Sequence, residues 1–259
     1  MYLSSERLAL ANEVVKKTFE DACVAWQTFP QWVTGDPAQT EVRLDNTATP
    51  GFVPIQSAST PFEVTLAEVI APTPDSLLSN VIANTVLLAA KVDAAVVPAL
   101  RQPPPATARP TQSVGAATAP DLLDALIDAR AKVETAGYRA PTCLITNTVG
   151  VKKLSQFLNG VSVLSQLLDV ANCNSLQRVD VLEDPATDAL GYMIGRRQRL
   201  GHQAAAEAFP GEEPVDIAVS VPPSLEVIGD TPNNTIKLAV RVRFATRVKD
   251  VQGLVVFVP

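Results

Sequence analysis

The segment that most constrains this chain is TIKLAVRVRFATRVKD, residues 235–250, in which apolar and charged residues alternate. Side chains alternate between the two faces of a strand, so the pattern predicts a strand with one apolar and one cationic face. About 14 residues at roughly 3.3 Å each span on the order of 45 Å, whereas an ordinary strand has about 5–6 residues. The chain must therefore fold around an unusually long strand. Its cationic face consists of Lys237, Arg241, Arg243, Arg247 and Lys249.

This cationic face has three interpretations. It can be a solvated face of a sheet, it can pair with carboxylates of a neighbouring subunit, or it can lie against nucleic acid. The chain of 259 residues has a net charge of −6, which argues against nucleic-acid binding by its whole surface. Only a local stripe could contact phosphates, and no aromatic residues interleave with this one.

Two segments have the 3,4 spacing of apolar residues that is typical of amphipathic helices. Residues 4–27 form the first, with Ser4 or Ser5 as its cap. The second begins at Asp75 or Ser76 and ends before Pro98, a length of roughly 30 Å. Lys91 and Asp93 interrupt its apolar run, so we expect a buried helix and not a membrane span.

Residues 35–74 have no helical period, many prolines and two short alternating runs, at 41–44 and 62–70. A structureless segment of this length is uncommon inside a compact domain. An extended two-stranded arm would account for it, with a turn at Thr49-Pro50-Gly51. An isolated hairpin is only marginally stable, so such an arm would lie on another surface. The alternative is a meandering edge of the main domain.

After the proline-rich connector at 101–112, the chain alternates between helical and strand patterns, which predicts a small α/β module. We expect helices at 121–137, 149–160 and 161–171, and strands at 140–147, 178–183 and 190–195. The last forty residues are predicted to be strands, at 215–221, 224–228, the long strand and 254–258. The turn residues at 229–234 precede the long strand.

Enzyme signatures are mostly absent. The single histidine, His202, has no partner motif, and Gly191, Gly195 and Gly201 lack the spacing of a dinucleotide-binding loop. Glu212, Glu213 and Asp216 could be imagined as an acid–base pair or cation site, but adjacent carboxylates in a Pro-Gly loop are usually a solvated turn. The cysteines, Cys23, Cys143 and Cys173, have no metal-ligand spacing and are expected to be buried thiols. We therefore predict no catalytic residue, cofactor or metal.

The order of elements resembles the Hong Kong 97-like fold of tailed-phage major capsid proteins, which encapsulin shells share. The stretches that carry the resemblance are DALIDARAKVETAGYRAPTCLITN at 124–147 and PSLEVIGDTPNNTIKLAVRVRFATRVKDVQGLVVFV at 223–258. The resemblance implies an α+β fold of four parts. They are an N-terminal arm with a helix at 1–34, an extended two-stranded loop at 35–74, a peripheral domain with a spine helix and long strands at 75–114 and 222–259, and an axial α/β domain at 115–221.

The resemblance implies a non-enzymatic shell protein: a major capsid protein that self-assembles into an icosahedral capsid around the double-stranded DNA of a tailed bacteriophage. It would act in the virion capsid, after assembly in the bacterial host cytoplasm. The alternative within this fold is an encapsulin nanocompartment that encloses an enzyme cargo. An α/β enzyme or binding protein that uses the loop GEEPVD at 211–216 is a third hypothesis.

The partners implied are many copies of the chain itself, in pentamers with hexamers as a further option. Further partners implied are portal, scaffolding or decoration proteins. Packaged DNA would be contacted only non-specifically, and no membrane partner is implied. Some relatives crosslink their shells through a lysine of the extended loop, but this chain has no lysine between Lys17 and Lys91, which excludes that bond. The residues expected at intersubunit contacts are Trp26, Trp32, Phe52, Val53, Ile55, Arg196, Arg197 and Arg199.

Overall fold

The computed structural model describes residues 3–44, 51–100, 110–158, 160–182, 190–198 and 213–259, without the side chains of residues 139–141 and 196–198. The chain forms two compact units, each built from segments distant in sequence. The first consists of Met1–Arg43, Phe52–Ala95 and Ile217–Thr246, and the second of Leu44–Gly51, Val96–Asp216 and Arg247–Pro259. The second unit is the one predicted as an α/β module.

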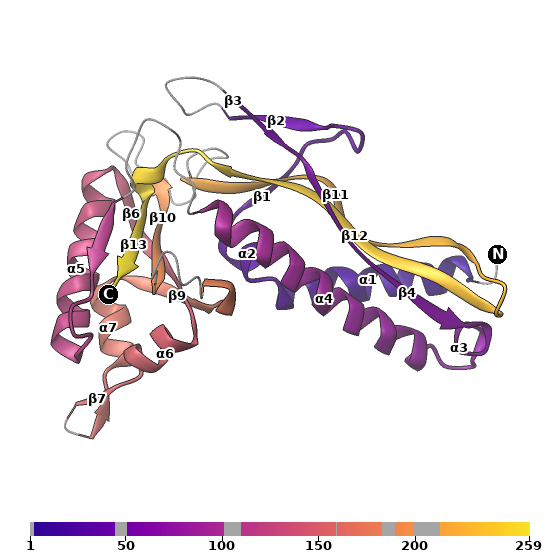
Figure 1. The fold of residues 1–259 in the computed structure, drawn as a ribbon, viewed down its shortest axis with the longest axis horizontal. Coiled ribbons are helices and arrows are strands. Elements are labelled where there is room, and N and C mark those ends of the chain that lie inside the picture. The colour runs from indigo at the N-terminus through magenta and orange to yellow at the C-terminus, as the bar shows by residue number, and fades with distance from the viewer. Residues whose placement is uncertain (1–2, 45–50, 101–109, 159, 183–189, 199–212) are drawn as a thin grey trace. The chain divides into compact units, whose positions relative to one another are not determined.

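A four-stranded sheet in the order β1-β11-β12-β4 organises the first unit (Figure 1). Its strands are β1 (Gln31–Val33), β4 (Gln56–Thr65), β11 (Val215–Asp230) and β12 (Thr235–Val248). The predicted long strand is β12, with 14 residues. It pairs antiparallel with β4 from Thr235 opposite Thr65 to Phe244 opposite Gln56. One edge of the long strand therefore pairs with a segment that the sequence predicts to lie in the extended loop.

Strand β11 is a single strand of 16 residues, where the sequence suggested two strands separated by Pro222 and Pro223. Its pairing with β1 stops at Val219. Beyond that point no strand of the described residues lies on this side of β11, and the edge of a sheet is where proline is tolerated. The side chain of Asn12 accepts a hydrogen bond from the Leu225 N–H at 2.9 Å, so the interrupted edge is satisfied by a helix.

Four helices complete the first unit. They are α1 (Ser5–Ala22), α2 (Val24–Thr28), α3 (Leu66–Ile70) and α4 (Asp75–Ala99). Asn12 joins α1 to β11, and the Lys91 ammonium joins α4 to β4 through the Ser59 carbonyl at 2.7 Å. The Arg7 guanidinium donates to the carbonyl groups of Val69 and Ala71, which satisfies acceptors at the end of α3. Hydrogen bonds from three helices therefore fix them to the sheet or to each other.

Helix α4 confirms the predicted long helix, except that it includes Pro98 in its last turn and ends at Ala99. One face is buried at a spacing of three and four residues, through Leu77, Val81, Thr85, Leu88, Val92 and Val96. The opposite face exposes Ile82, Val86 and Leu87. By length and composition alone α4 could cross a membrane, but the core helix of a folded domain passes the same test, so this is weak evidence for a span.

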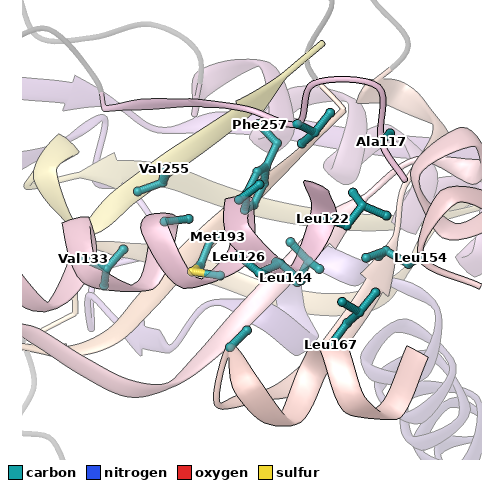
Figure 2. Close-up of a cluster of buried hydrophobic side chains, with 14 of the residues drawn as sticks. Ala117, Leu122, Leu126, Val133, Leu144, Leu154, Leu167, Met193, Val255 and Phe257 are labelled. Carbon is teal, nitrogen blue, oxygen red and sulfur yellow. The ribbon is translucent and has the colours of Figure 1, made fainter. Parts of the chain in front are cut away.

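The second unit is built on a five-stranded sheet in the order β5-β13-β10-β6-β9. The strands are β5 (Thr111–Ser113), β6 (Tyr138–Thr146), β9 (Cys173–Arg178), β10 (Gly191–Gln198) and β13 (Leu254–Val258). The helices are α5 (Ala119–Thr135), α6 (Thr148–Leu154) and α7 (Leu164–Val170), with short 3-10 turns at Asp180–Leu182 and Val251–Gly253. Figure 2 shows the core, where Leu126 and Val133 of α5 meet Leu144, Met193 and Phe257 of the sheet.

Three features of this unit differ from the sequence prediction. The strand predicted at 178–183 lies earlier, as β9, and Asp180–Leu182 form a 3-10 turn. Strand β13 pairs with β10 and β5, so the end of the chain lies in this sheet and not in the peripheral domain to which 222–259 was assigned. The 3-10 turn at Val251–Gly253 separates β13 from β12. Leu254–Phe257 of β13 are buried, and the strand lies between β5 and β10 in the sheet. The predicted helix at 149–160 ends at Leu154 and continues as a hairpin, β7 (Phe157–Leu158) and β8 (Val161–Ser162).

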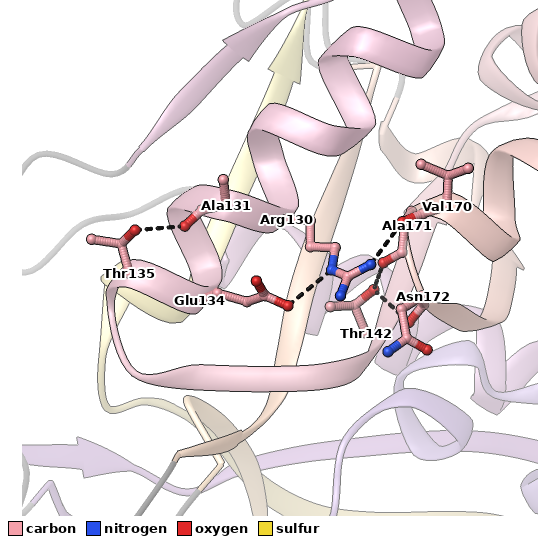
Figure 3. A network of polar contacts seen from close by, with 8 residues as sticks. All are labelled: Arg130, Ala131, Glu134, Thr135, Thr142, Val170, Ala171 and Asn172. Carbon is pink, nitrogen blue, oxygen red and sulfur yellow. Dashed lines mark hydrogen bonds and ion pairs between the residues drawn. The ribbon is translucent and has the colours of Figure 1, made fainter.

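Polar contacts at helix ends add to this core (Figure 3). Arg130 of α5 pairs with Glu134 at 2.9 Å and also donates to the carbonyl of Val170, the last residue of α7, at 2.9 Å. A cation at a helix C-terminus is favourable because the unpaired carbonyl groups carry partial negative charge. The Thr142 hydroxyl lies 3.3 Å from the carbonyl oxygens of Ala171 and Asn172. These contacts attach α7 to both α5 and β6.

Replacing Gly195 with alanine is expected to lower the free energy of unfolding by about 1–3 kcal/mol because the strand here touches its neighbours. An added Cβ would lie 2.6 Å from Tyr138 Cβ and 2.6 Å from Val133 Cγ1. Gly51, which has no atom within 4 Å of the same position, provides the matched control. Urea unfolding followed by circular dichroism measures both, and equal stabilities for the two variants would contradict the close packing.

Candidate assembly surfaces

The predicted extended loop is divided between two structures. Strands β2 (Glu41–Leu44) and β3 (Gly51–Pro54) form a two-stranded sheet, whereas β4 belongs to the edge of the four-stranded sheet. The arm is therefore much shorter than the predicted 35–74, because ten residues of that segment pair with β12. The predicted two-stranded arm corresponds to β2 and β3, and the alternative, an edge of the main domain, corresponds to β4.

Three of the predicted intersubunit residues pack on their own chain. Trp32, Val53 and Ile55 are partly buried against a small cluster formed by Val42, Ala218 and Ala245. Phe52 lies on the opposite face of β3, because strand residues alternate, and is 64% exposed. Of the loop residues predicted to reach a neighbour, Phe52 is the one left open in the isolated chain.

The other predicted contact residues have different positions. Half-buried Trp26 packs edge-to-face on Phe19, with ring centroids 5.0 Å apart and an interplanar angle of 87°. The backbone of Arg196 and Arg197 belongs to β10, but their side chains lie outside the described residues, as does all of Arg199. His202 and Glu212 also lie outside them.

The cationic face of β12 does not continue as one exposed stripe. Lys237 is exposed. Arg241 pairs with Glu226 of β11 at 2.9 Å, and Arg243 donates to the carbonyl groups of Pro37 and Gln39. Two of the arginines are thus partnered within the first unit, which reduces the charge that the strand offers to a neighbour or to nucleic acid.

The last two cations of the stripe are buried, which corrects the prediction of a charged face along its whole length. Arg247 and Lys249 are 9% and 4% exposed, and both contact Asp216, which is 3% exposed. Arg247 donates from Nε to Asp216 Oδ1 at 2.7 Å and from Nη2 to Oδ2 at 2.6 Å. The Lys249 ammonium lies 3.0 Å from Oδ2. One carboxylate therefore neutralises part of the charge of two buried cations.

The same contact corrects the interpretation of the acidic loop. Asp216 is not part of a solvated turn. It is the second residue of β11, and its buried carboxylate pairs with Arg247. Both of its carboxylate oxygens contact the buried cations. We find no group of three His, Cys, Asp or Glu placed to hold a metal among the described residues.

A second buried carboxylate joins two helices of the first unit. Asp93 of α4 accepts hydrogen bonds from the N–H groups of Val24 at 3.2 Å and Ala25 at 2.8 Å, and from the Cys23 thiol at 3.3 Å. It thereby caps α2, where the predicted continuous helix 4–27 breaks at Cys23. Burial raises the pKa of Asp93, and burial followed by the Asp93 charge raises the pKa of the Cys23 thiol. The buried thiols predicted at Cys23 and Cys143 are confirmed, whereas Cys173 is only partly buried.

Sequence reasoning missed one exposed apolar element, the hairpin β7–β8. Phe157, Leu158 and Val161 are 73%, 52% and 59% exposed on it. The signal was present in the sequence as Asn159-Gly160 between Phe157-Leu158 and Val161, a dipeptide typical of two-residue hairpin turns. The helical spacing of the flanking leucines obscured it.

Neither family models nor curated proteins match this chain. Among solved structures, the virus-like particle from Pyrococcus furiosus is similar with a TM-score of 0.70 and 15% identity, covering 97% of this chain and 99% of that chain. A protein of Mycobacterium phage Cain has a TM-score of 0.59 and 15% identity over 92% and 90% of the two chains. The SrpI encapsulin of Synechococcus elongatus PCC 7942 has a TM-score of 0.60 and 11% identity over 91% and 87%. These likenesses establish the fold, and the α+β architecture expected from the sequence is confirmed.

Proposed function

We propose that this chain, which has the Hong Kong 97-like fold, is a shell subunit that self-assembles in many copies into a closed icosahedral particle. The observation that carries the proposal is the match to the virus-like particle subunit, which covers nearly the whole of both chains. Because the match covers both chains almost completely, it supports a subunit with the same set of structural parts. A chain that shared only a core domain with the particle subunit would match over a smaller part of its length. The proposed role is structural, with no catalytic residue.

The exposed apolar residues support the same function. Phe52 on β3, the outer face of α4 and the hairpin β7–β8 each present large apolar side chains to water in the single chain. Exposed apolar groups that gather on one element often mark protein–protein contacts. In a shell each would be covered by another copy.

For the contents of the shell we propose the double-stranded DNA genome of a tailed bacteriophage, with the chain as its major capsid protein. The likeness to a protein of Mycobacterium phage Cain supports this function. The subunit would then be found in the virion capsid, after assembly in the bacterial host cytoplasm with portal, scaffolding or decoration proteins. With a net charge of −6 the chain would make only weak, non-specific contact with packaged DNA, because tight phosphate binding needs a strongly basic surface.

A second candidate is an encapsulin nanocompartment with an enzyme cargo, which the likeness to the SrpI encapsulin favours. The two functions differ in contents and not in fold. Particles purified from the source cells separate them, since nuclease-protected double-stranded DNA supports the capsid and a co-purifying enzyme supports the compartment.

The purified chain is expected to form closed particles of uniform diameter. Negative-stain microscopy and analytical ultracentrifugation measure this directly. A well-folded monomer that persists at high protein concentration, with and without co-expressed neighbouring genes, would contradict the shell function in both forms.

A further inference from the structure

The hairpin β7–β8 is a small apolar projection of the second unit (Figure 1). Phe157 pairs with Ser162 and Leu158 with Val161, and the two strands form a sheet of their own. Each strand is therefore paired on one side only within the part of the chain that the structure describes. Its other edge offers backbone donors and acceptors to a further strand.

The base of the hairpin is fixed, although its tip is open. Leu154 and Val163, on either side of it, are buried in the core of the second unit. The Val163 N–H donates to the Gln156 carbonyl at 3.1 Å, and the Gln156 side chain donates to the Ala117 carbonyl at 2.6 Å. The apolar tip is thus held away from its own core, and an isolated two-stranded hairpin is at best marginally stable in water. Another surface must cover it.

The charge pattern indicates what that surface is. No charged residue lies between Lys153 and Asp169, so the hairpin and both its flanks are neutral. When identical elements meet around a symmetry axis, any charge on them is repeated in every copy and repels itself, so a neutral, apolar element is favoured there. Free strand edges are also self-complementary, because each offers the same backbone groups.

We infer that the hairpin β7–β8 contacts the same hairpin of neighbouring copies around a symmetry axis of the particle, with Phe157, Leu158 and Val161 in the contact. The inference rests on the proposed shell function and adds a specific self-contact to it. The partner is a second copy of this chain, bound by apolar contact and strand edges.

Two variants of opposite charge, Phe157→Lys and Phe157→Glu, test this contact, each expressed alone and then both together. Alone, each variant is expected to raise the protein concentration needed for particle formation at least tenfold at about 0.15 M salt, because like charges meet across the contact. Mixed in equal amounts, they are expected to assemble within about threefold of the wild-type concentration, because mixed rings bring opposite charges together at many of the contacts, although five copies around an axis cannot alternate completely. Light scattering and microscopy follow assembly, with Val149→Lys, an exposed apolar residue on α6, as the matched control.

The outcomes separate this inference from the shell function. If the wild-type chain forms no particles, the shell function fails and the hairpin contact fails with it. If the wild type assembles and both charged variants do so at the same concentration, the hairpin contact is overturned while the shell function stands. If the variants fail alone and mixing does not restore assembly, the hairpin meets a different surface, which also overturns the inference. Near-ultraviolet circular dichroism of each variant, and assembly of Phe157→Leu, verify that folding is intact.

Discussion

Replacing Asp216 with alanine is expected to lower the free energy of unfolding of the second unit by about 3–5 kcal/mol. The carboxylate lies 3.0 Å from the buried Lys249 ammonium and accepts two hydrogen bonds from Arg247. Without it, two cations remain buried side by side, and each keeps its desolvation cost while losing its neutralising charge. Removing one member of a buried ion pair is costly for this reason, even where the intact pair contributes little net stability.

Urea unfolding and hydrogen–deuterium exchange of β10 and β13 measure the effect, because these strands belong to the unit that contains the cluster. The matched control is Glu226→Ala, which breaks the half-exposed ion pair with Arg241 and should cost under about 1 kcal/mol. The triple variant Asp216→Leu, Arg247→Met, Lys249→Met is expected to recover to within about 2 kcal/mol of the wild type, since no buried charge is left unpaired. Equal losses for Asp216→Ala and Glu226→Ala would contradict the burial of the cluster.

The elements with the longest regular patterns were predicted from the sequence. Alternation identified β12, and 3,4 spacing identified α4 and most of α1. A period that repeats over many residues places the apolar side chains on one face of the element. The order of these elements was sufficient for the resemblance to the fold. The predicted turn before the long strand lies where β11 ends at Asp230 and β12 begins at Thr235.

The rest depended on contacts between residues distant in sequence. Asp216 and Arg247 are 31 residues apart, and no local pattern indicates that one carboxylate neutralises cations on the next strand. Strand β11 continues through Pro222 at an edge of the sheet that no described strand covers, where Asn12 of α1 accepts from the Leu225 N–H. The face of a strand is predictable from parity, but what lies against that face is decided by tertiary pairing. For that reason the charged residues of β12 were identified correctly while their exposure was not.

Replacing Asp93 with alanine is expected to lower the free energy of unfolding of the first unit by about 2–3 kcal/mol. The variant removes the acceptor for the N–H groups of Val24 and Ala25, which are the first donors of α2, and it leaves them buried without a partner. Relief of the desolvation cost of the carboxylate offsets part of this loss. Thr85→Val, in the same buried face of α4, is the control because its hydroxyl bonds only to the preceding turn, at the Val81 carbonyl.

Asp93 also predicts how stability changes with pH. Burial raises its pKa in the folded chain above the unfolded value, so in the range between the two values the folded chain binds more protons. Stability should therefore fall as the pH rises through that range, and this part of the pH dependence should vanish in Asp93→Asn, which cannot titrate. Urea midpoints from about pH 4, near the ordinary pKa of aspartate, to pH 8, compared between wild type and Asp93→Asn, measure it. A difference in urea midpoint between the two proteins that stays constant across this pH range would contradict the titration of Asp93. A loss of unfolding free energy in Asp93→Ala no larger than in Thr85→Val would contradict the role of the carboxylate at the junction of α1 and α2.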